Sequence, residues 1–374
     1  MIVLLTLGAG TLGHKVANPS RTPQDQWMAH PHRVRDIAVQ AGLSQATVDR
    51  VLNGRGGVRA STVAQVGRAV AELDRQQTQL AVDGRTFLVD VVVDAPQRFS
   101  HAVRAALEAE LPGLRPAVVR GRFTLTEAAP AAEIAAALHR VADRGSHGVV
   151  LKAPDSPEVT DAVARVQRAG IPVITLVTDL PGTARLAYVG LDNRAAGATA
   201  AYLVDRWLPA DDAAVLVIRG DSAFRGEDER EMGFRATLRA TARPGAEPRR
   251  LVELVHSAGG DDTLRRAVTE SLARHGDIAA VYSMYAFGGN AAVLDAFDRA
   301  GRRSAVFVTH DLNADNRALL LDGRISAVLH HDLNDDLRRC CWLIMQARGA
   351  LPGTPVTLTS PIQVVTPYNV PPAR

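Results

Sequence analysis

The feature that most constrains the fold is an alternation of apolar runs with helical segments, which begins at Thr86 and continues toward the C-terminus. Runs such as 87–93, 147–153 and 213–218 are nearly continuous in apolar residues, and each is followed by a segment with helical periodicity. Strands of this kind are buried on both faces, which is typical of parallel sheets with right-handed helical crossovers. The sequence therefore predicts an α/β domain over residues 86–370.

The length of this region indicates more than one sheet. About 285 residues exceed what a single parallel sheet comfortably holds. The strand–helix scheme runs once near 86–190 and again near 192–325, and a last strand is expected near 356–365. We therefore predict two Rossmann-like lobes with parallel sheets, and a ligand cleft at the carboxyl ends of their strands.

A purely helical pattern occupies the region before this domain. A first set of apolar residues at helical spacing ends at Gly42, a residue typical of a left-handed helix end. Ser44 is a favourable N-cap for a second helix that Asn53 ends, and a third helical pattern runs to Leu73. These features predict an all-α helix-turn-helix over residues 28–73, although a generic three-helix bundle has the same periodicity.

The second helix of this region carries side chains suited to DNA. Gln45, Ala46, Asp49 and Arg50 point away from its apolar face. Glutamine can pair with adenine and arginine with guanine in the major groove. The whole chain carries 43 basic and 40 acidic residues, a net charge of +3, whereas residues 33–68 hold six arginines against two aspartates. The positive charge is therefore concentrated where DNA binding is expected.

The stretch VRDIAVQAGLSQATVDRVLNGRGGV resembles the N-terminal headpiece of the lactose-repressor (LacI/GalR) family of bacterial transcription regulators. The shared pattern D-[IV]-A-x-x-A-G-[VL]-S-x-x-T-V-x-R-V-L-N is matched from Asp36 to Asn53. The resemblance implies a cytoplasmic repressor that binds a palindromic double-stranded DNA operator as a homodimer, with a tetramer left open. It also implies that the DNA-binding residues are Ser44, Gln45, Ala46, Thr47, Asp49, Arg50, Asn53, Arg55 and Arg59.

Three positions depart from the family pattern. Asp49 replaces the usual serine, and it would either accept a hydrogen bond from a cytosine amino group or orient Arg50. Arg59 replaces the Ser/Thr cap before the third helix. Residues 74–85, expected as a linker, lack the family's Tyr-x-Pro-Asn hinge and have Gly84 at the wedge position, so Leu80 is the nearest substitute. Whether this linker kinks DNA is left open.

Residues 86–370 resemble the type I periplasmic-binding-protein fold, which is the effector domain of LacI-family regulators. The most specific segments are YVGLDNRAAG (188–197), EREMGF (229–234) and VTHDL (308–312). The resemblance implies a small ligand, a sugar or cyclitol, between the lobes, and a chain that crosses between them about three times. From the strand ends and the family positions, we expect the ligand-binding residues to be Gln97, Arg98, Phe99, Asp155, Asp179, Arg230, Asn290, Asp311 and His331.

Two other classes of protein fit the sequence less well. A sugar-modifying enzyme needs a catalytic motif, and the chain contains no GxSxG, HExxH or CxxC sequence. We therefore expect no enzymatic activity, no cofactor and no metal. The alternative, a solute-binding protein of a sugar transporter, would carry an export signal and no helix-turn-helix. The headpiece favours the regulator, and it leaves open whether the ligand is an inducer or a corepressor.

The first 27 residues differ from the rest of the chain. A G-x-G-x-x-G motif at 8–13 is typical of a dinucleotide-binding turn, but Pro19 stops the helix that this motif requires. The apolar run lacks a preceding basic region and is too short to span a bilayer, so we predict neither a signal peptide nor a membrane partner. We expect residues 1–27 to be a disordered extension or to precede a natural start at Met28.

The two cysteines, Cys340 and Cys341, are adjacent in the sequence. Neighbouring residues rarely reach the geometry of a disulfide, so no bridged scaffold is expected. Free thiols are typical of a reducing compartment, which agrees with a cytoplasmic protein.

Overall fold

The computed structural model describes residues 32–208, 213–221, 224–242, 247–256, 260–284 and 289–372. The glycine motif at 8–13 and the expected start at Met28 lie outside these residues. The chain divides into two compact units, Met1–Gln77 and Thr78–Arg374. Each unit is described by itself.

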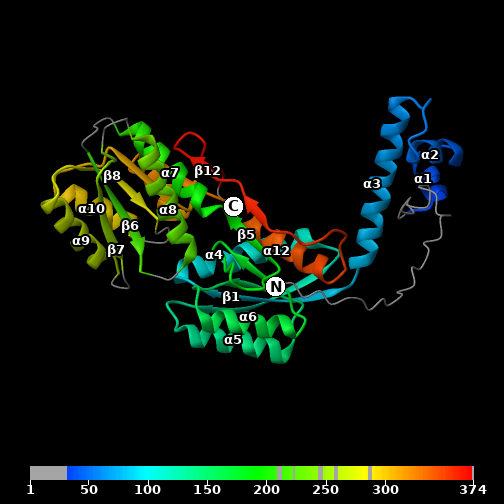
Figure 1. Cartoon of the computed structure of the whole chain (residues 1–374), viewed down its shortest axis with the longest axis horizontal. Helices are drawn as coiled ribbons and strands as arrows, with labels where there is room; N and C mark the ends of the chain where they lie inside the picture. Colours follow the sequence, from blue (N-terminus) through cyan, green and yellow to red (C-terminus); the bar gives the residue numbers. More distant parts are fainter. Residues whose placement is uncertain are drawn as a thin grey trace, which may run out of the picture. The chain divides into compact units, whose positions relative to one another are not determined.

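The described part of the first unit is a small helical bundle, as predicted. Gly42 ends the first helix with a φ of 63°, and the Ser44 hydroxyl accepts a hydrogen bond from the Thr47 amide at 3.2 Å at the start of the second. A compact core joins the helices through Ile37, Ala38, Ala41, Val48, Val66 and Ala69. The helices are α1 Val34–Ala41, α2 Gln45–Leu52 and α3 Ala60–Val82 (Figure 1).

The third helix is longer than the sequence analysis predicts. The segment 74–85 was expected to be a linker, but α3 continues through it to Val82. The physical reason is that this segment contains three Gln residues, with one Leu and one Ala, and neither Gly nor Pro before Gly84, which has a φ of 67°. The loss of apolar periodicity after Leu73 therefore does not mark the end of the helix.

The second unit contains two lobes, each built on a six-stranded sheet. In the first lobe the strand order is β11-β5-β4-β3-β1-β2, and every pairing is parallel. Helices α5 and α6 cover one face of this sheet, and α4 and α12 cover the other (Figure 1). The elements are β1 Thr86–Asp94, α4 Gln97–Glu110, β2 Val118–Thr126, α5 Ala131–Arg144, β3 Gly148–Lys152, α6 Pro157–Arg168, β4 Val173–Leu176, β5 Ala187–Leu191, α12 Leu333–Ala347 and β11 Leu358–Ser360, with a short 3-10 helix at Leu111–Leu114.

The second lobe repeats the scheme with the order β12-β10-β9-β8-β6-β7, in which β12 is antiparallel to β10. Helices α7 and α8 pack on one face, and α9, α10 and α11 on the other. The elements are α7 Asn193–Trp207, β6 Ala214–Gly220, α8 Arg225–Thr241, β7 Leu251–His256, α9 Gly260–Arg274, β8 Ile278–Ser283, α10 Asn290–Arg299, β9 Val306–His310, α11 Ala314–Leu321, β10 Ala327–His330 and β12 Gln363–Val365. Two Rossmann-like lobes are therefore confirmed.

The described chain passes between the lobes three times, between β5 and α7, between β10 and α12, and between β11 and β12. The single last strand expected near 356–365 is wrong, because this segment forms two short strands in different sheets. Pro361, which cannot donate a backbone hydrogen bond, lies at the point where the chain changes sheet. Within the described residues, no helix has the length and apolar character needed to span a membrane.

Candidate functional site

The predicted DNA-binding residues lie on α2, at its ends and at the start of α3. Gln45, Ala46 and Arg50 are exposed on α2. The cap at Ser44 is reinforced by a 2.8 Å hydrogen bond between its hydroxyl and that of Thr47. Arg59 directly precedes α3 and is exposed. The unit therefore presents one polar helix face for DNA, and the individual base and phosphate contacts stay predictions.

Asp49, the acidic residue on this helix, is held by its own neighbours. Its Oδ1 accepts a hydrogen bond from the Asn53 amide at 2.8 Å, and its Oδ2 lies 3.1 Å from Nη1 of Arg55. Asp49 therefore pairs with Arg55 and not with Arg50, and its contact with a cytosine stays a prediction. Exposed ion pairs of this kind contribute about 0–1 kcal/mol, so the Arg55 guanidinium can exchange Asp49 for a phosphate at little cost.

A cleft of about 550 Å³ is lined by both lobes of the second unit. Its walls come from residues at or just after the carboxyl ends of strands in both sheets, and from the N-terminal turns of α4, α8 and α9. This is the place where open parallel sheets bind ligands. Five of the nine predicted ligand-binding residues line it, and these are Gln97, Arg98, Phe99, Arg230 and Asp311.

The structure does not bring the other four to the cleft lining. Asp155 is exposed in the segment after β3. The carboxylate of Asp179 accepts hydrogen bonds within its own segment from Arg185 and from the Thr175 hydroxyl. Burial raises the pKa of the Asp179 carboxyl, but these hydrogen bonds lower it more, so its pKa falls below the usual value. The Asp179 carboxylate therefore stabilises the conformation of its own loop.

Asn290 and His331 are buried behind the cleft. The Asn290 amide donates to the Thr309 hydroxyl at 3.0 Å and to Asn316 at 2.8 Å, which joins α10 to β9 and α11. His331 lies behind Asp311, with Nε2 at 3.6 Å from the nearer carboxylate oxygen. Neither residue lines the cleft.

Lys152 is a cleft residue that the sequence analysis missed. Its ammonium lies 3.3 Å from the Asp94 carbonyl oxygen, 3.3 Å from the centre of the Phe224 ring and 5.5 Å from that of Phe99. Burial lowers the pKa of this lysine to about 8, while Glu227 and other carboxylates partly oppose the shift. A signal was present in the sequence, because Lys152 lies near the end of the predicted strand 147–153 and Asp94 directly follows the predicted strand 87–93.

Asp94 is the second missed cleft residue. Its Oδ1 accepts from the Thr126 hydroxyl at 2.8 Å and from the Ala129 amide at 3.1 Å. Asp94 is 4% exposed and lines the cleft. Its carboxylate is therefore held through one oxygen at the border of the ligand space. Fixed carboxylates of this kind can accept hydrogen bonds from ligand hydroxyl groups.

Arg230 reaches the cleft from α8 because α7 and α8 pack unusually close. A Cβ atom on Gly197 would lie 1.9 Å from the Arg230 carbonyl oxygen, so only glycine permits this approach. The guanidinium is oriented by donation from Nε to Asn193 at 2.8 Å and from Nη1 to the Met284 carbonyl at 3.2 Å. Arg230 is buried but borders the cleft, so it is a preoriented donor.

Asp311 enters the cleft from a strained backbone position. Its φ is 60°, which is uncommon for a residue other than glycine. The side chain of Asn316 holds this conformation by donating to the carbonyls of His310 at 3.0 Å and Asp311 at 2.8 Å. Strain at a cleft residue that neighbours maintain is typical of a functional position.

The cleft lining is rich in charge, with carboxylates in excess over cations. Its carboxylates are Asp94, Glu127, Asp221, Glu227, Asp261 and Asp311, and its arginine and lysine side chains are Arg98, Lys152 and Arg230. This set can accept from and donate to many hydroxyl groups, and Phe99 and Phe224 supply apolar surface. Among the residues that the structure describes, no group of His, Cys, Asp and Glu side chains could hold a metal ion.

The desolvated ammonium of Lys152 has a consequence for stability. Its pKa is about 8 when folded against 10.5 for an ordinary lysine. At pH 7 the charge therefore costs the folded state about 3 kcal/mol. We expect Lys152→Met to raise the free energy of unfolding by about that amount at pH 7, as measured by urea denaturation.

The pH dependence of this gain follows from the two pKa values. Between about 8 and 10.5 the unfolded state binds more protons than the folded state, so wild-type stability rises with pH. The advantage of Lys152→Met should therefore be full below pH 8 and should shrink toward pH 10.5. A gain that stays constant over this range would contradict a charged, buried Lys152.

The two units together define a class of protein, namely a helix-turn-helix DNA-binding domain joined to a two-lobed ligand-binding domain. Residues 92–349 match the family described as Periplasmic binding protein domain, and residues 33–75 match that described as Bacterial regulatory proteins, lacI family. The chain belongs to the periplasmic-binding-protein domain family, and with its LacI-type headpiece it is a LacI-family transcription regulator.

Solved structures share the fold of the second unit. A candidate LacI transcriptional regulator from Bacteroides fragilis is 15% identical, with 76% of this chain and 98% of that chain covered and a TM-score of 0.66. GanP, a glucose-galactose binding protein from Geobacillus stearothermophilus, is 18% identical, with coverage of 77% and 99% and a TM-score of 0.66. A solute-binding protein from Burkholderia graminis in complex with D-arabinose is 19% identical, with coverage of 76% and 96% and a TM-score of 0.66. A search of curated proteins finds no match.

Proposed function

We propose that this regulator is a repressor that binds a palindromic operator as a homodimer and responds to a sugar or cyclitol held between its lobes. The observation that carries the proposal is the presence in one chain of a capped recognition helix and a cleft lined by buried Arg230, Lys152 and Asp311. One headpiece reads a half-site, and a palindromic operator therefore matches a two-fold symmetric pair.

The chemistry of the cleft supports a polyhydroxylated ligand. Fixed carboxylates on Asp94 and Asp311 can accept hydrogen bonds, and Arg230 and Lys152 can donate them, to adjacent hydroxyl groups. The ring of Phe99 is a surface for the apolar C–H face of such a ligand. The named ligands of structural neighbours, D-arabinose and glucose or galactose, supply first probes.

The location we propose is the cytoplasm, where a DNA operator is found. Cys340 and Cys341 are both free and buried. Burial raises the pKa of both thiols, that of Cys341 to about 12, so neither is a reactive thiolate at neutral pH. Such cysteines agree with a reducing compartment.

The experiment that tests the function is an electrophoretic mobility shift on the DNA upstream of the protein's own gene, at low salt. We expect a shift that a sugar of the D-arabinose, D-glucose, D-galactose and myo-inositol panel changes. A sugar that weakens the complex identifies an inducer, and one that strengthens it identifies a corepressor. Absence of any shift at low salt, where phosphate contacts are strongest, contradicts the proposal.

A further inference from the structure

A chain of buried polar side chains runs from the cleft to the segments that join the lobes. Nε2 of His331 lies 3.6 Å from Oδ1 of Asp311, which lines the cleft. Nδ1 of the same imidazole lies 2.6 Å from Oδ2 of Asp336. The other oxygen of Asp336 accepts a hydrogen bond from the Ser360 hydroxyl. The side chains therefore form a series from Asp311 through His331 and Asp336 to Ser360.

These side chains come from different lobes. Asp311 follows β9 and His331 follows β10, both strands of the second lobe. Asp336 is in the first turn of α12 and Ser360 ends β11, and both of these elements belong to the first lobe. The bond between His331 and Asp336 therefore joins the two lobes at one crossover, and Ser360 extends the connection to another.

The cluster is closed to solvent. The side chains of His331 and Asp336 are 3% and 1% exposed. A buried carboxylate is strongly destabilising unless it is paired and hydrogen-bonded, and His331 and Ser360 take one oxygen each. Moving one lobe against the other at this crossover would break that pairing, so the cluster is sensitive to the relative position of the lobes.

We propose that His331 is a positioning residue that holds the cleft carboxylate of Asp311. When a ligand binds to this carboxylate, His331 transmits the change to the lobe crossovers through Asp336 and Ser360. This inference rests on the proposed role of Asp311 in binding a polyhydroxylated ligand. It assigns His331 a function without direct contact to that ligand. Ligand affinity should then depend on whether the His331 imidazole is protonated.

The charged and titratable groups around His331 determine the direction of that dependence. They are Asp336 on α12, Asp311 after β9, Arg230 on α8, His310 on β9 and His330 on β10. Burial lowers the pKa of His331 and so does Arg230, but the hydrogen bond and charge of Asp336 and the charge of Asp311 raise it above the ordinary 6.5. The favourable effect of the charged imidazole is complete below pH 6.5 and is lost as pH rises through the raised pKa.

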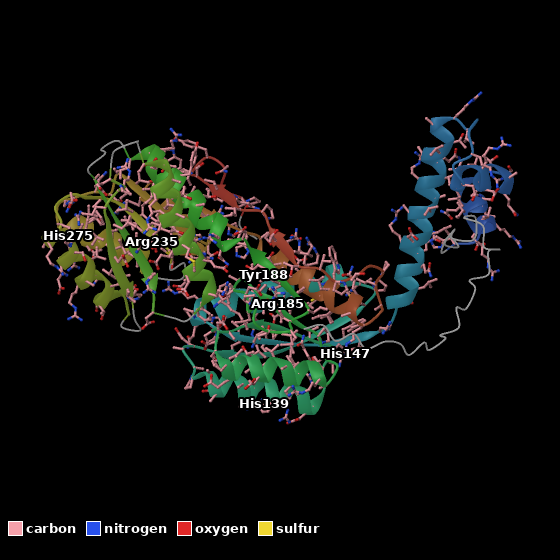
Figure 2. All side chains as sticks on the ribbon, in the orientation of Figure 1. His139, His147, Arg185, Tyr188, Arg235 and His275 are labelled. Atoms are coloured by element: carbon pink, nitrogen blue, oxygen red, sulfur yellow. The ribbon has the colours of Figure 1, made fainter. Side chains whose placement is uncertain are left out.

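The direct test is a titration of His331 by nitrogen-15 histidine NMR on the full chain, with its signal assigned by its loss in His331→Gln. We expect a pKa above 6.5 in the wild type. Asp336→Asn and Asp311→Asn should each lower it by about one unit or more. His139→Gln is the matched control, because His139 lies on the outer helix α5 (Figure 2), and it should leave the His331 pKa unchanged. No effect of Asp311→Asn overturns the proposal, since the cleft carboxylate and the imidazole would then be uncoupled.

A second measurement connects the cluster to binding. Calorimetric titration with D-arabinose, D-galactose and myo-inositol between pH 6 and pH 7.5, below the pKa of about 8 of Lys152, should show affinity falling as pH rises. Asp336→Asn should move that fall to lower pH, and His331→Gln should bind about tenfold more weakly with a flat profile. A profile that Asp336→Asn leaves in place overturns the proposal. If none of the three sugars binds the wild type, the sugar assignment fails, while the NMR titration still decides whether the cluster is coupled.

Discussion

Arg230→Ala should abolish the response to the sugar while leaving operator binding intact. The guanidinium is buried, oriented by Asn193 and the Met284 carbonyl, and borders the cleft. Losing a charged hydrogen-bond donor from a desolvated site costs about 3 kcal/mol, which is about a 100-fold loss of sugar affinity. Isothermal titration with the responding sugar measures the affinity, and a mobility shift measures operator binding.

Arg235→Ala supplies the control for this variant. Arg235 lies on the same helix, but it pairs with Glu231 and Glu253 and does not line the cleft (Figure 2). Its removal should change sugar affinity by less than about twofold, because partly exposed ion pairs contribute little. Normal sugar affinity in Arg230→Ala would show that the cleft assignment is wrong, even if the operator response changed.

Arg50→Ala should weaken operator binding and leave sugar affinity unchanged. Arg50 is exposed on α2, the predicted recognition helix, and it belongs to the other unit of the chain. One bidentate arginine–guanine contact contributes about 1–3 kcal/mol. A homodimer has two such contacts, so we expect a loss between about 30-fold and about 2 × 10⁴-fold, as measured by fluorescence anisotropy with a labelled operator at fixed salt.

The control for Arg50→Ala is Arg68→Ala, which removes an exposed arginine from α3. Arg68 is outside the predicted DNA contacts, so its loss should lower affinity only modestly through the overall charge. Equal losses in the two variants would mean that α2 contributes charge and not base recognition. Loss of discrimination between operator and random DNA in Arg50→Ala alone supports its assignment to a base.

Much of the fold could be predicted because the local signals were strong. The predicted apolar runs 87–93 and 213–218 form β1 Thr86–Asp94 and β6 Ala214–Gly220, because both are nearly continuous in apolar residues. The extension of α3 to Val82 could not be predicted from apolar periodicity, because residues 74–82 carry no regular apolar spacing and favour a helix only through their intrinsic propensities. The division of the last strand between two sheets depends on long-range pairing, which no local pattern encodes.

The cleft could be predicted in part for a related reason. Asp311 directly follows β9 and Arg98 lies in the first turn of α4 after β1, and strand ends meet at the cleft. Asp179 and His331 are polar residues that follow strands, so the sequence predicts them in the cleft. In the structure the Asp179 carboxylate is bonded to Arg185 and the His331 imidazole to Asp336. Which polar side chain faces the ligand and which supports a neighbour depends on partners distant in sequence. Lys152 was missed because a lysine ending a buried strand is rarely expected to stay buried.

The central claim is that sugar binding in the cleft and operator binding by the headpiece are linked. The most direct measurement determines operator affinity with and without saturating sugar, and sugar affinity with and without saturating operator, in one buffer. Thermodynamic linkage requires the two ratios to be equal, and we expect each to be at least about fivefold, within the usual range of allosteric coupling. If the protein binds both the sugar and the operator but both ratios equal one, the account of a ligand-controlled regulator is contradicted.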